Sequence, residues 1–218
     1  MKLHIGCGQT LLNGFINIDN SPSALLSRLP LFFLSALYKL SLINADQLGF
    51  AKILKSHKKE FLYSGCLHLP FGNNSVDLCY SSHMIGWYLS VEQLNAFFRE
   101  MYRVMRPGAG MRLSFVDFDL VLEEYRQHRS TIQFMDRLPR GAQVSTFGDK
   151  LKFLFSPNRH NGILLNADMA RQFLEQHHFQ NIAVVAAGET TLEAGEVEGI
   201  DLYQRSDESV YIECRRLS

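Results

Sequence analysis

Short apolar segments of strand length alternate with longer segments of helical periodicity along most of the chain. This alternation is typical of a parallel sheet covered on both faces, because successive parallel strands need a crossover connection between them. The clearest helix is predicted over residues 91–105, where apolar side chains recur every three or four positions until Pro107-Gly108 ends the pattern. A second helix is predicted at Ala167–His177, and strands at Lys2–Ile5, Phe15–Ile18, Phe61–Tyr63, Val76–Ser81, Gly110–Val116, Ile182–Ala186 and Ser209–Arg215. The sequence therefore predicts an α/β fold with a seven-stranded sheet.

Two segments interrupt the alternation. Residues 21–57 are rich in Leu and Phe and are predicted to be helical with a break at Pro30, whereas residues 119–166 mix helical and loop-like sequence. Both follow the carboxyl ends of expected strands, where α/β sheets place ligands, so we expect them to wall and roof a pocket. A chain of 218 residues then forms a single domain over 1–218 with two insertions.

The first insertion carries large apolar side chains whose role the sequence leaves open. A lid, a dimer face and a lipid contact are alternatives, and packing in the core is the default expectation. The side chains concerned are Leu31, Phe32, Phe33, Leu37 and Leu40.

The overall charge is balanced, with 22 Lys and Arg against 22 Asp and Glu. This balance argues against a nucleic-acid partner, since such proteins usually present a basic face. The longest strongly apolar stretch without charge, Leu29–Tyr38, has 10 residues, and a membrane span needs about 20. The N-terminus lacks a signal-peptide pattern, and the four cysteines lie far apart without the spacing of a metal site. We therefore expect a cytoplasmic protein without a metal site or a membrane span. Whether it forms a homodimer is a question that the sequence leaves open.

Gly6-Cys7-Gly8 directly follows the first expected strand. Residues without side-chain bulk at this position allow the backbone to approach a nucleoside or phosphate closely. Asp19 ends the second expected strand, where an acid can accept hydrogen bonds from ribose hydroxyls, although a turn or N-cap role competes with this interpretation. Only 11 positions separate Gly8 from Asp19, so the crossover helix between the two strands must be very short.

The most specific pattern lies between residues 67 and 117. It contains Leu-Pro-Phe-Gly-Asn-Asn-Ser-Val-Asp at 69–77 and Arg-Val-Met-Arg-Pro-Gly-Ala-Gly at 103–110. This succession resembles the class I S-adenosylmethionine-dependent methyltransferases, in particular the small, methyltransferase type 11-like subgroup. The resemblance implies a doubly wound, Rossmann-like sheet of seven mostly parallel strands with the last strand antiparallel, and methyl transfer from S-adenosylmethionine to a small-molecule acceptor such as a sugar or polysaccharide precursor.

The same resemblance implies which residues hold the cofactor. Its amino-acid portion is expected at the glycine turn, its ribose at Asp19, its adenine just before the Leu-Pro-Phe segment, and its methyl group near the end of the fourth strand. The cofactor-binding residues implied are Gly6, Cys7, Gly8, Asp19, Cys66, Leu67, His68 and Ser82.

His83 follows Ser82 and is the predicted catalytic residue. A neutral imidazole at this edge can take the proton of a hydroxyl acceptor during the transfer. A histidine that only shapes the pocket is the alternative.

Departures from the family pattern leave a second interpretation open. Residues 64–68 contain no acid for the adenine amino group, and the usual His-x-Leu-Glu-His after the fourth strand is His-Met-Ile-Gly-Trp at 83–87. The alternative to an enzyme is therefore a non-catalytic module with the methyltransferase fold and a degenerate cofactor site.

Overall fold

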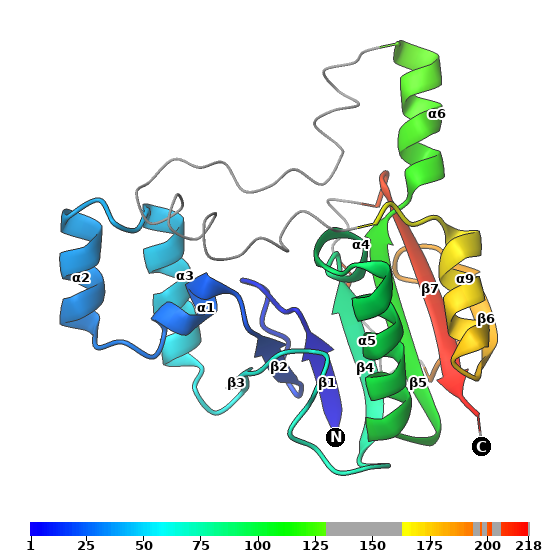
Figure 1. Ribbon diagram of the computed structural model, residues 1–218, viewed down its shortest axis with the longest axis horizontal. Coiled ribbons are helices and arrows are strands. Elements are labelled where there is room, and N and C mark those ends of the chain that lie inside the picture. Colours follow the sequence, from blue (N-terminus) through cyan, green and yellow to red (C-terminus); the bar gives the residue numbers. More distant parts are fainter. Residues whose placement is uncertain (130–162, 194–196, 198–199, 202–205, 218) are drawn as a thin grey trace.

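The computed structural model describes residues 1–129, 163–193, 197, 200–201 and 206–217. Seven strands form one sheet in the order β3-β2-β1-β4-β5-β7-β6 (Figure 1). Strands β1 to β5 are parallel, and β7 is antiparallel to both of its neighbours, β5 and β6. The predicted fold class is therefore confirmed. The strands are β1 (Lys2–Ile5), β2 (Ile16–Asp19), β3 (Phe61–Tyr63), β4 (Val76–Ser82), β5 (Met105–Val116), β6 (Phe179–Val185) and β7 (Ser209–Arg216).

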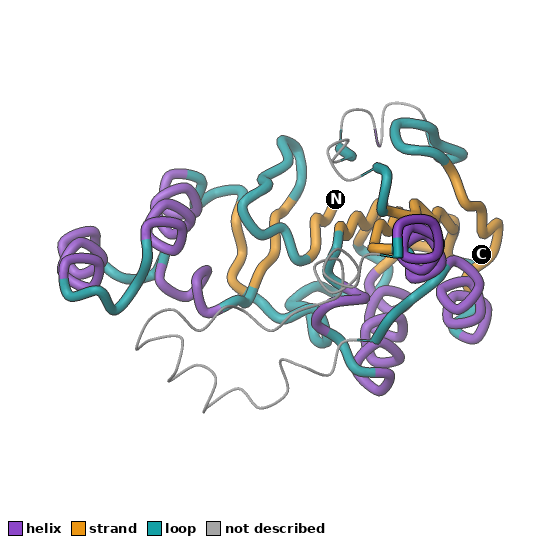
Figure 2. The backbone as a smooth tube through the Cα atoms, turned by 90° about the horizontal axis from the view of Figure 1, so that it is seen from above, coloured by secondary structure: helices purple, strands orange, loops and turns teal. Residues whose placement is uncertain are grey.

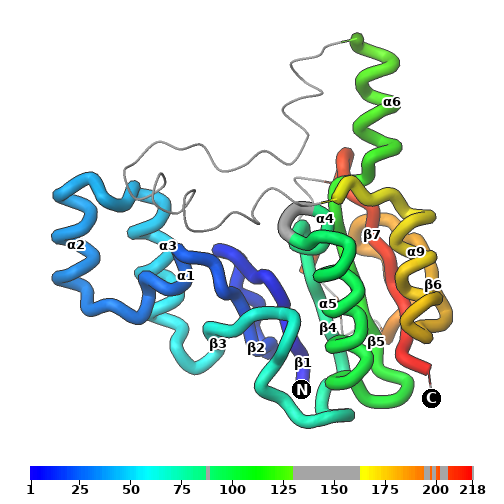
Figure 3. Tube along the Cα trace, in the orientation of Figure 1, coloured from blue at the N-terminus to red at the C-terminus, as the bar shows by residue number. Residues whose placement is uncertain are grey.

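The helices of the described residues fall into two groups (Figures 1 and 3). Three of them lie beyond the β3 edge of the sheet, and the others lie beside or above the central strands. The first group consists of α1 (Pro22–Leu26), α2 (Leu31–Lys39) and α3 (Ala45–Ser56); the second consists of α4 (Ile85–Tyr88), α5 (Val91–Val104), α6 (Phe118–His128) and α9 (Ala167–Gln176). None of the helices in this part of the chain combines the length and the apolar content that crossing a bilayer requires.

The first insertion is helical and breaks at Pro30, as predicted, because Pro30 is the residue that precedes α2. The second insertion begins with α6, whose N-cap is Asp117. Residues 130–162, which make up most of that insertion, lie outside the described residues.

Helix α5 and strand β5 follow one another without a connecting loop. Helix α5 begins with a capping box in which Ser90 and Gln93 bond each other's backbone N–H groups. It ends at Val104, and β5 begins at Met105, which pairs with Val76 of β4. The helix therefore ends within one residue of the predicted end at Met105, but Pro107-Gly108 is not what ends it. Pairing with β4 ends the helix first, and both residues lie within β5.

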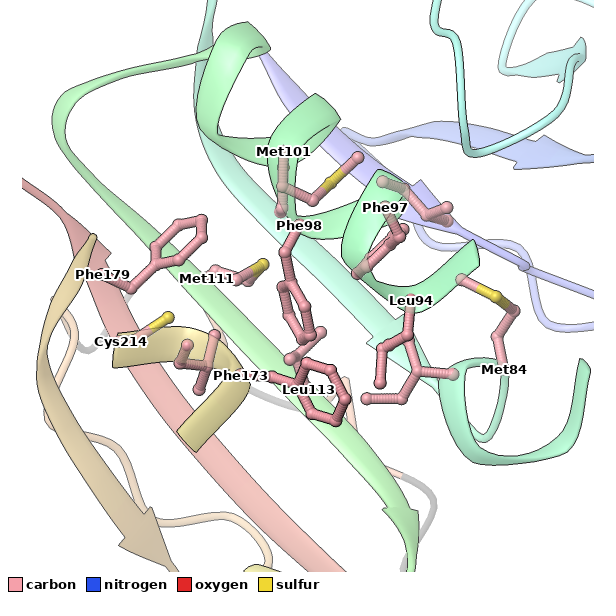
Figure 4. Packing of buried hydrophobic residues seen from close by; sticks show 14 of the residues in the cluster. Met84, Leu94, Phe97, Phe98, Met101, Met111, Leu113, Phe173, Phe179 and Cys214 are labelled. Carbon is pink, nitrogen blue, oxygen red and sulfur yellow. The ribbon is translucent and has the colours of Figure 1, made fainter. Parts of the chain in front are cut away.

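One face of the sheet packs against α5 and α9 through apolar side chains (Figure 4). Phe98 of α5 is fully buried, and its ring stacks on Phe173 of α9 and meets the edge of Phe179 in β6. Met111 and Leu113 of β5 present their side chains to the same cluster. This face is the main hydrophobic core.

The opposite face is covered differently. Seen from above, α5 and α9 lie on one side of the strands, and the segment that follows β6 lies on the other (Figure 2). Leu192 and Ile200 of that segment pack on Leu78 and Tyr80 of β4 and on Phe15. The connection between β6 and β7 therefore covers the second face at this point.

A buried ionic cluster joins this connection to the sheet. Arg112 of β5 is 1% exposed, and its guanidinium donates to Asp201 (3.0 Å) and to Glu213 of β7 (2.5 Å). The backbone N–H of Gly188 donates to Asp201, and that of Thr191 donates to Glu213. Burial by itself would lower the pKa of Arg112, but the two carboxylates raise it overall. Burial by itself would raise the pKa of Glu213, but hydrogen bonds from Thr191, Thr190 and Arg112 lower it overall. Arg112 and Glu213 are thus held charged inside the protein.

The crossover from β1 to β2 contains turns and no helix between residues 6 and 15, all of which are described. The very short helix predicted here is therefore wrong. The buried side chain of Asn17 holds this loop in place of a helix. Its amide oxygen accepts from the N–H of Leu12 (2.9 Å), and its amide nitrogen donates to the carbonyl of Leu12 (3.1 Å). His4 bonds the same amide oxygen from β1. Asn17 thus organises the loop that carries the glycine turn.

Candidate functional site

The glycine turn and Asp19 meet at the carboxyl edge of β1 and β2. The N–H groups of Gly6 and Cys7 donate to the carbonyl of Ile18, which closes the turn against β2. The Gly8 N–H then donates to Asp19 Oδ2 at 3.1 Å. The other carboxylate oxygen accepts from the N–H of Ser21 at 2.7 Å. The structure therefore brings together two features that are 11 positions apart in the sequence.

Gly6 and Gly8 both have positive φ angles, +69° and +51°, which glycine adopts without steric cost. Their surroundings differ. A Cβ on Gly6 would lie 2.6 Å from the side chain of Met84, whereas a Cβ on Gly8 would meet nothing within 4 Å. Gly6 is thus required by packing, and Gly8 borders open space that a larger side chain would fill.

Cys7 lies between them and is buried. Burial raises the pKa of its thiol well above the ordinary range, and the Asp19 carboxylate raises it further. The thiol therefore stays protonated, and Cys7 contributes to the site through its backbone.

The segment after β3 approaches Asp19 from the other side. Cys66 and Leu67 are half-buried and pack against the main core, whereas His68 is exposed. Burial raises the pKa of Cys66 to about 11, and the nearby Asp19 carboxylate adds to the shift. Next to them, a Cβ on Gly65 would lie 3.3 Å from the side-chain amide nitrogen of Asn20. Asn20 thus belongs to the same edge, although the sequence alone did not single it out.

The Leu-Pro-Phe segment is fixed by two residues of α5. Glu100 accepts the N–H of Leu69 (2.5 Å), and Arg103 donates to the carbonyls of Leu69 and Phe71. Arg103 also forms an ion pair with Glu100, which is buried. The sequence signal that could have indicated this ion pair is the spacing of three residues, since side chains at that spacing meet on one face of a helix.

Ser82 ends β4 and His83 follows it, and the hydrogen bonds of both residues run towards β5 and β7. Ser82 accepts a hydrogen bond from Ser114 of β5 at 3.0 Å. The His83 backbone N–H donates to the Ser114 carbonyl, and its ring Nε2 lies 3.2 Å from the hydroxyl of Ser209 in β7. Because β5 lies between β4 and β7, the imidazole is directed away from β1.

The backbone of His83 has a φ of +53°, in the left-handed region that is uncommon for a residue with a Cβ. This conformation turns the chain so that the next residue, Met84, packs on Gly6. The residue that touches the glycine turn is therefore Met84, the N-cap of α4 just after β4, which the sequence did not indicate.

The predicted residues thus fall into two groups at one edge of the sheet. The first group lies around Asp19, and the second consists of the Ser82–Ser114 hydroxyl pair and the contact between the His83 ring and Ser209. The first group contains Gly6, Cys7, Gly8, Asp19 and Cys66, with Leu67 and His68 next to Cys66 in the chain, and the second contains Ser82 and His83 with Ser114 and Ser209.

Comparison with known proteins agrees with this architecture. Residues 35–112 match the family model described as "Methyltransferase domain", a range that starts after the glycine turn and Asp19. The fold is similar to a SAM-dependent methyltransferase from Thermotoga maritima (TM-score 0.53, 13% identity, 99% of this chain and 81% of that one). A SAM-dependent methyltransferase from Methanosarcina mazei is also similar (TM-score 0.53, 14% identity, 99% of this chain and 92% of that one).

A third similar structure, a protein from Bordetella parapertussis, has a TM-score of 0.47 at 14% identity, with 100% of this chain covering 61% of that one. No match was found among curated protein sequences. At these identities the structural similarity shows the fold. Together with the family match over residues 35–112, it agrees with the predicted resemblance to the class I S-adenosylmethionine-dependent methyltransferases.

Proposed function

We propose that this chain is a class I S-adenosylmethionine-dependent methyltransferase, on the grounds of its fold and its family match, and that it methylates a small-molecule acceptor. Our candidate acceptor is a sugar or polysaccharide precursor. The observation that carries the proposal is the hydrogen bond between the Gly8 N–H and Asp19 at the carboxyl edge of the sheet. Ligands of α/β sheets bind at this edge. The balanced charge supports a small acceptor over a nucleic acid.

The residues around Asp19 fit the cofactor. S-adenosylmethionine supplies a methyl group on a positively charged sulfur. Each Asp19 oxygen already accepts one backbone N–H, and a carboxylate has about four acceptor positions, so two remain for the ribose hydroxyls. The open space beside Gly8 leaves room for the amino-acid portion along the backbone of Gly6, Cys7 and Gly8.

The segment at 66–68 suits the adenine. Cys66 and Leu67 offer a half-buried apolar surface that is anchored to the core, and His68 is exposed next to them. Residues 64–68 contain no carboxylate for the adenine amino group. The side-chain carbonyl of Asn20, beside Gly65, can accept a hydrogen bond from that group instead.

Ser82 and His83 are assigned to the acceptor side of the reaction. The contact between His83 and the Ser209 hydroxyl orients the imidazole, and one ring nitrogen can accept a proton when the other carries one. Displacement at the methyl group mainly requires alignment of the acceptor, so His83 assists without being indispensable.

The free cysteines among the described residues support a reducing, cytoplasmic location.

Calorimetric titration with S-adenosylhomocysteine tests the cofactor site. We expect Asp19→Ala to weaken binding about 10- to 150-fold, because it removes charge-assisted hydrogen bonds worth about 1.5–3 kcal/mol. We expect Gly8→Val to abolish binding by filling the open space.

Gly14→Val is the matched control for Gly8→Val. Gly14 lies in the same crossover, also has a positive φ (+77°), and also has no atom within 4 Å of its Cβ position. The control should bear the same backbone strain and still bind. Unchanged affinity in folded Asp19→Ala would remove Asp19 from the site, and binding without methyl transfer to any acceptor would favour a non-catalytic module.

The pH–rate profile with a hydroxyl acceptor tests His83. We expect His83→Ala to lower turnover by about 100- to 10,000-fold while the affinity for S-adenosylhomocysteine changes little. The rate of the parent should fall as the pH drops and the base becomes protonated, and this limb should disappear in the variant. If the limb survives, another group is the base.

A further inference from the structure

Helix α2 presents apolar side chains to solvent. Phe32 is 71% exposed, Leu40 directly after the helix is 68% exposed, and Leu31 and Phe33 are each 52% exposed. The default expectation that these side chains pack in the core is wrong for these four, although Leu37 does pack, against the small cluster around Leu34. We call Leu31, Phe32, Phe33 and Leu40 the α2 patch.

The patch does not follow the usual pattern of a surface helix. Leu34 is fully buried, and it fixes which side of α2 faces the protein. At 100° per residue, Phe32 lies about 160° from Leu34, on the solvent side. A surface helix normally places polar residues there. The Phe32 and Phe33 rings instead lie in contact, with centroids 5.1 Å apart.

Basic residues far outnumber acidic ones in the segment that carries the α2 patch. Residues 21–59 contain six Lys or Arg and a single acid, Asp46. Lys39 lies within α2, and Arg28, Lys52, Lys58 and Lys59 are exposed in the neighbouring helices and loops. The helical group at the β3 edge therefore combines exposed aromatic side chains with a positive charge, in a chain whose total charge is zero.

We propose that the α2 patch docks the protein onto the surface of a bilayer containing anionic phospholipid. Helix α2 has nine residues, so it would lie in the plane of the interface with Phe32 and Phe33 inserted among the acyl chains. The Lys and Arg side chains of this segment would contact the negative headgroups. Among the described helices of its group, α2 is the outermost and lies farthest from the sheet (Figures 1 and 2).

Charge favours a bilayer over a second copy of the chain. Two copies that met through this region would bring their excess of basic groups together, with one acid each to offset it. An anionic surface supplies the opposite charge. The inference does not depend on the proposed methyl transfer, since it rests on residues 21–59 alone.

Vesicle co-sedimentation tests the proposal. We expect the protein to bind vesicles of phosphatidylcholine with phosphatidylglycerol. Its partition coefficient for pure phosphatidylcholine vesicles should be lower by about tenfold or more. Binding should fall when salt rises from about 0.1 M to about 1 M, because screening weakens the headgroup contacts. The double variant Phe32→Ser/Phe33→Ser should lower the partition coefficient about tenfold or more.

Val184→Ser is the matched control, since Val184 is 49% exposed on β6, at the opposite edge of the sheet. It should bind vesicles as the parent does. Lys39→Glu tests the charge without changing the apolar side chains, and should reduce binding to the anionic vesicles only. Thermal unfolding of each variant verifies that it is folded.

Three results would overturn the proposal. The first is absence of vesicle binding by the parent, and the second is equal binding by the parent and both α2 variants. The third is a dimer in sedimentation-velocity experiments that dissociates in the Phe32→Ser/Phe33→Ser variant, which would make the α2 patch an interface between copies.

Discussion

The two faces of the central strands are held by different forces. Successive residues of one strand illustrate this, because Ile212 packs into the apolar core and Glu213 pairs with Arg112 on the opposite face. Both side chains are fully buried. In β5 the same alternation places Leu113 in the core and Arg112 in the ionic cluster.

This difference in forces shows how the second face of the sheet is covered although the β1–β2 crossover contains no helix. Apolar packing needs only a helix of suitable periodicity, such as α5, because the hydrophobic effect is not directional. The second face instead carries directional bonds. Glu213 is bonded by Thr191, and Asp201 by Gly188, so the ionic cluster fixes the β6–β7 connection on the sheet.

The largest effect on stability is expected from Arg112→Ala. This change leaves the Asp201 and Glu213 carboxylates buried without their cation, which typically costs about 3–5 kcal/mol. Urea unfolding of the parent and the variant measures the free energy of unfolding. A triple variant, Arg112→Met with Asp201→Leu and Glu213→Leu, should recover most of the loss, because an apolar replacement has no charge to desolvate. A loss below about 1 kcal/mol in Arg112→Ala would mean that the second face does not depend on the ionic cluster.

A smaller effect on the same face should appear as a pH dependence. Burial lowers the pKa of His4 to about 4 from its ordinary 6.5, and its hydrogen bond with Asn17 and the Asp19 charge offset part of that shift. The folded protein therefore holds His4 neutral, while the unfolded chain binds a proton below pH 6.5. The contribution of neutral His4 to the free energy of unfolding should be fully present above pH 6.5. The free energy of unfolding should decrease by up to about 3 kcal/mol as the pH falls to about 4.

Urea unfolding at a series of pH values between 7 and 4 measures this decrease. His4→Gln should flatten the curve in that range. An unchanged slope in His4→Gln would assign the acid sensitivity to other groups.

The sequence predicted the apolar face far better than the ionic one. The helical period of residues 91–105 and the strand lengths follow from local chemistry, so β1, β3 and α5 lie where they were predicted, within one residue. The contact between the glycine turn and Asp19 also follows from local position, because the turn follows β1, Asp19 ends β2, and the parallel topology brings these strand ends together.

The ionic cluster left no comparable signal. Arg112 and Asp201 are 89 positions apart, so no spacing rule connects them, and a lone Arg within an apolar segment does not reveal its partner. The direction of His83 was hidden for the same reason. Its ring turns towards Ser209, which is 126 positions away, through a left-handed backbone that is uncommon for histidine. The position of a strand end is predictable from sequence, but the direction of its side chains depends on distant contacts.

The smallest effect is expected on the apolar face, from Ile212→Val. The change removes one methylene from a fully buried side chain, which typically costs about 0.5–1.5 kcal/mol. Met101 and Met111 belong to the same cluster and can adjust to part of the space, so we expect a value near the lower end. The double variant Ile212→Val/Arg112→Ala then tests whether the two faces are independent. Independent faces predict that the two losses in the free energy of unfolding add within about 0.5 kcal/mol. A larger deviation would mean that loss of the ionic cluster shifts β5 and β7 themselves, and that the apolar packing depends on the charges behind it.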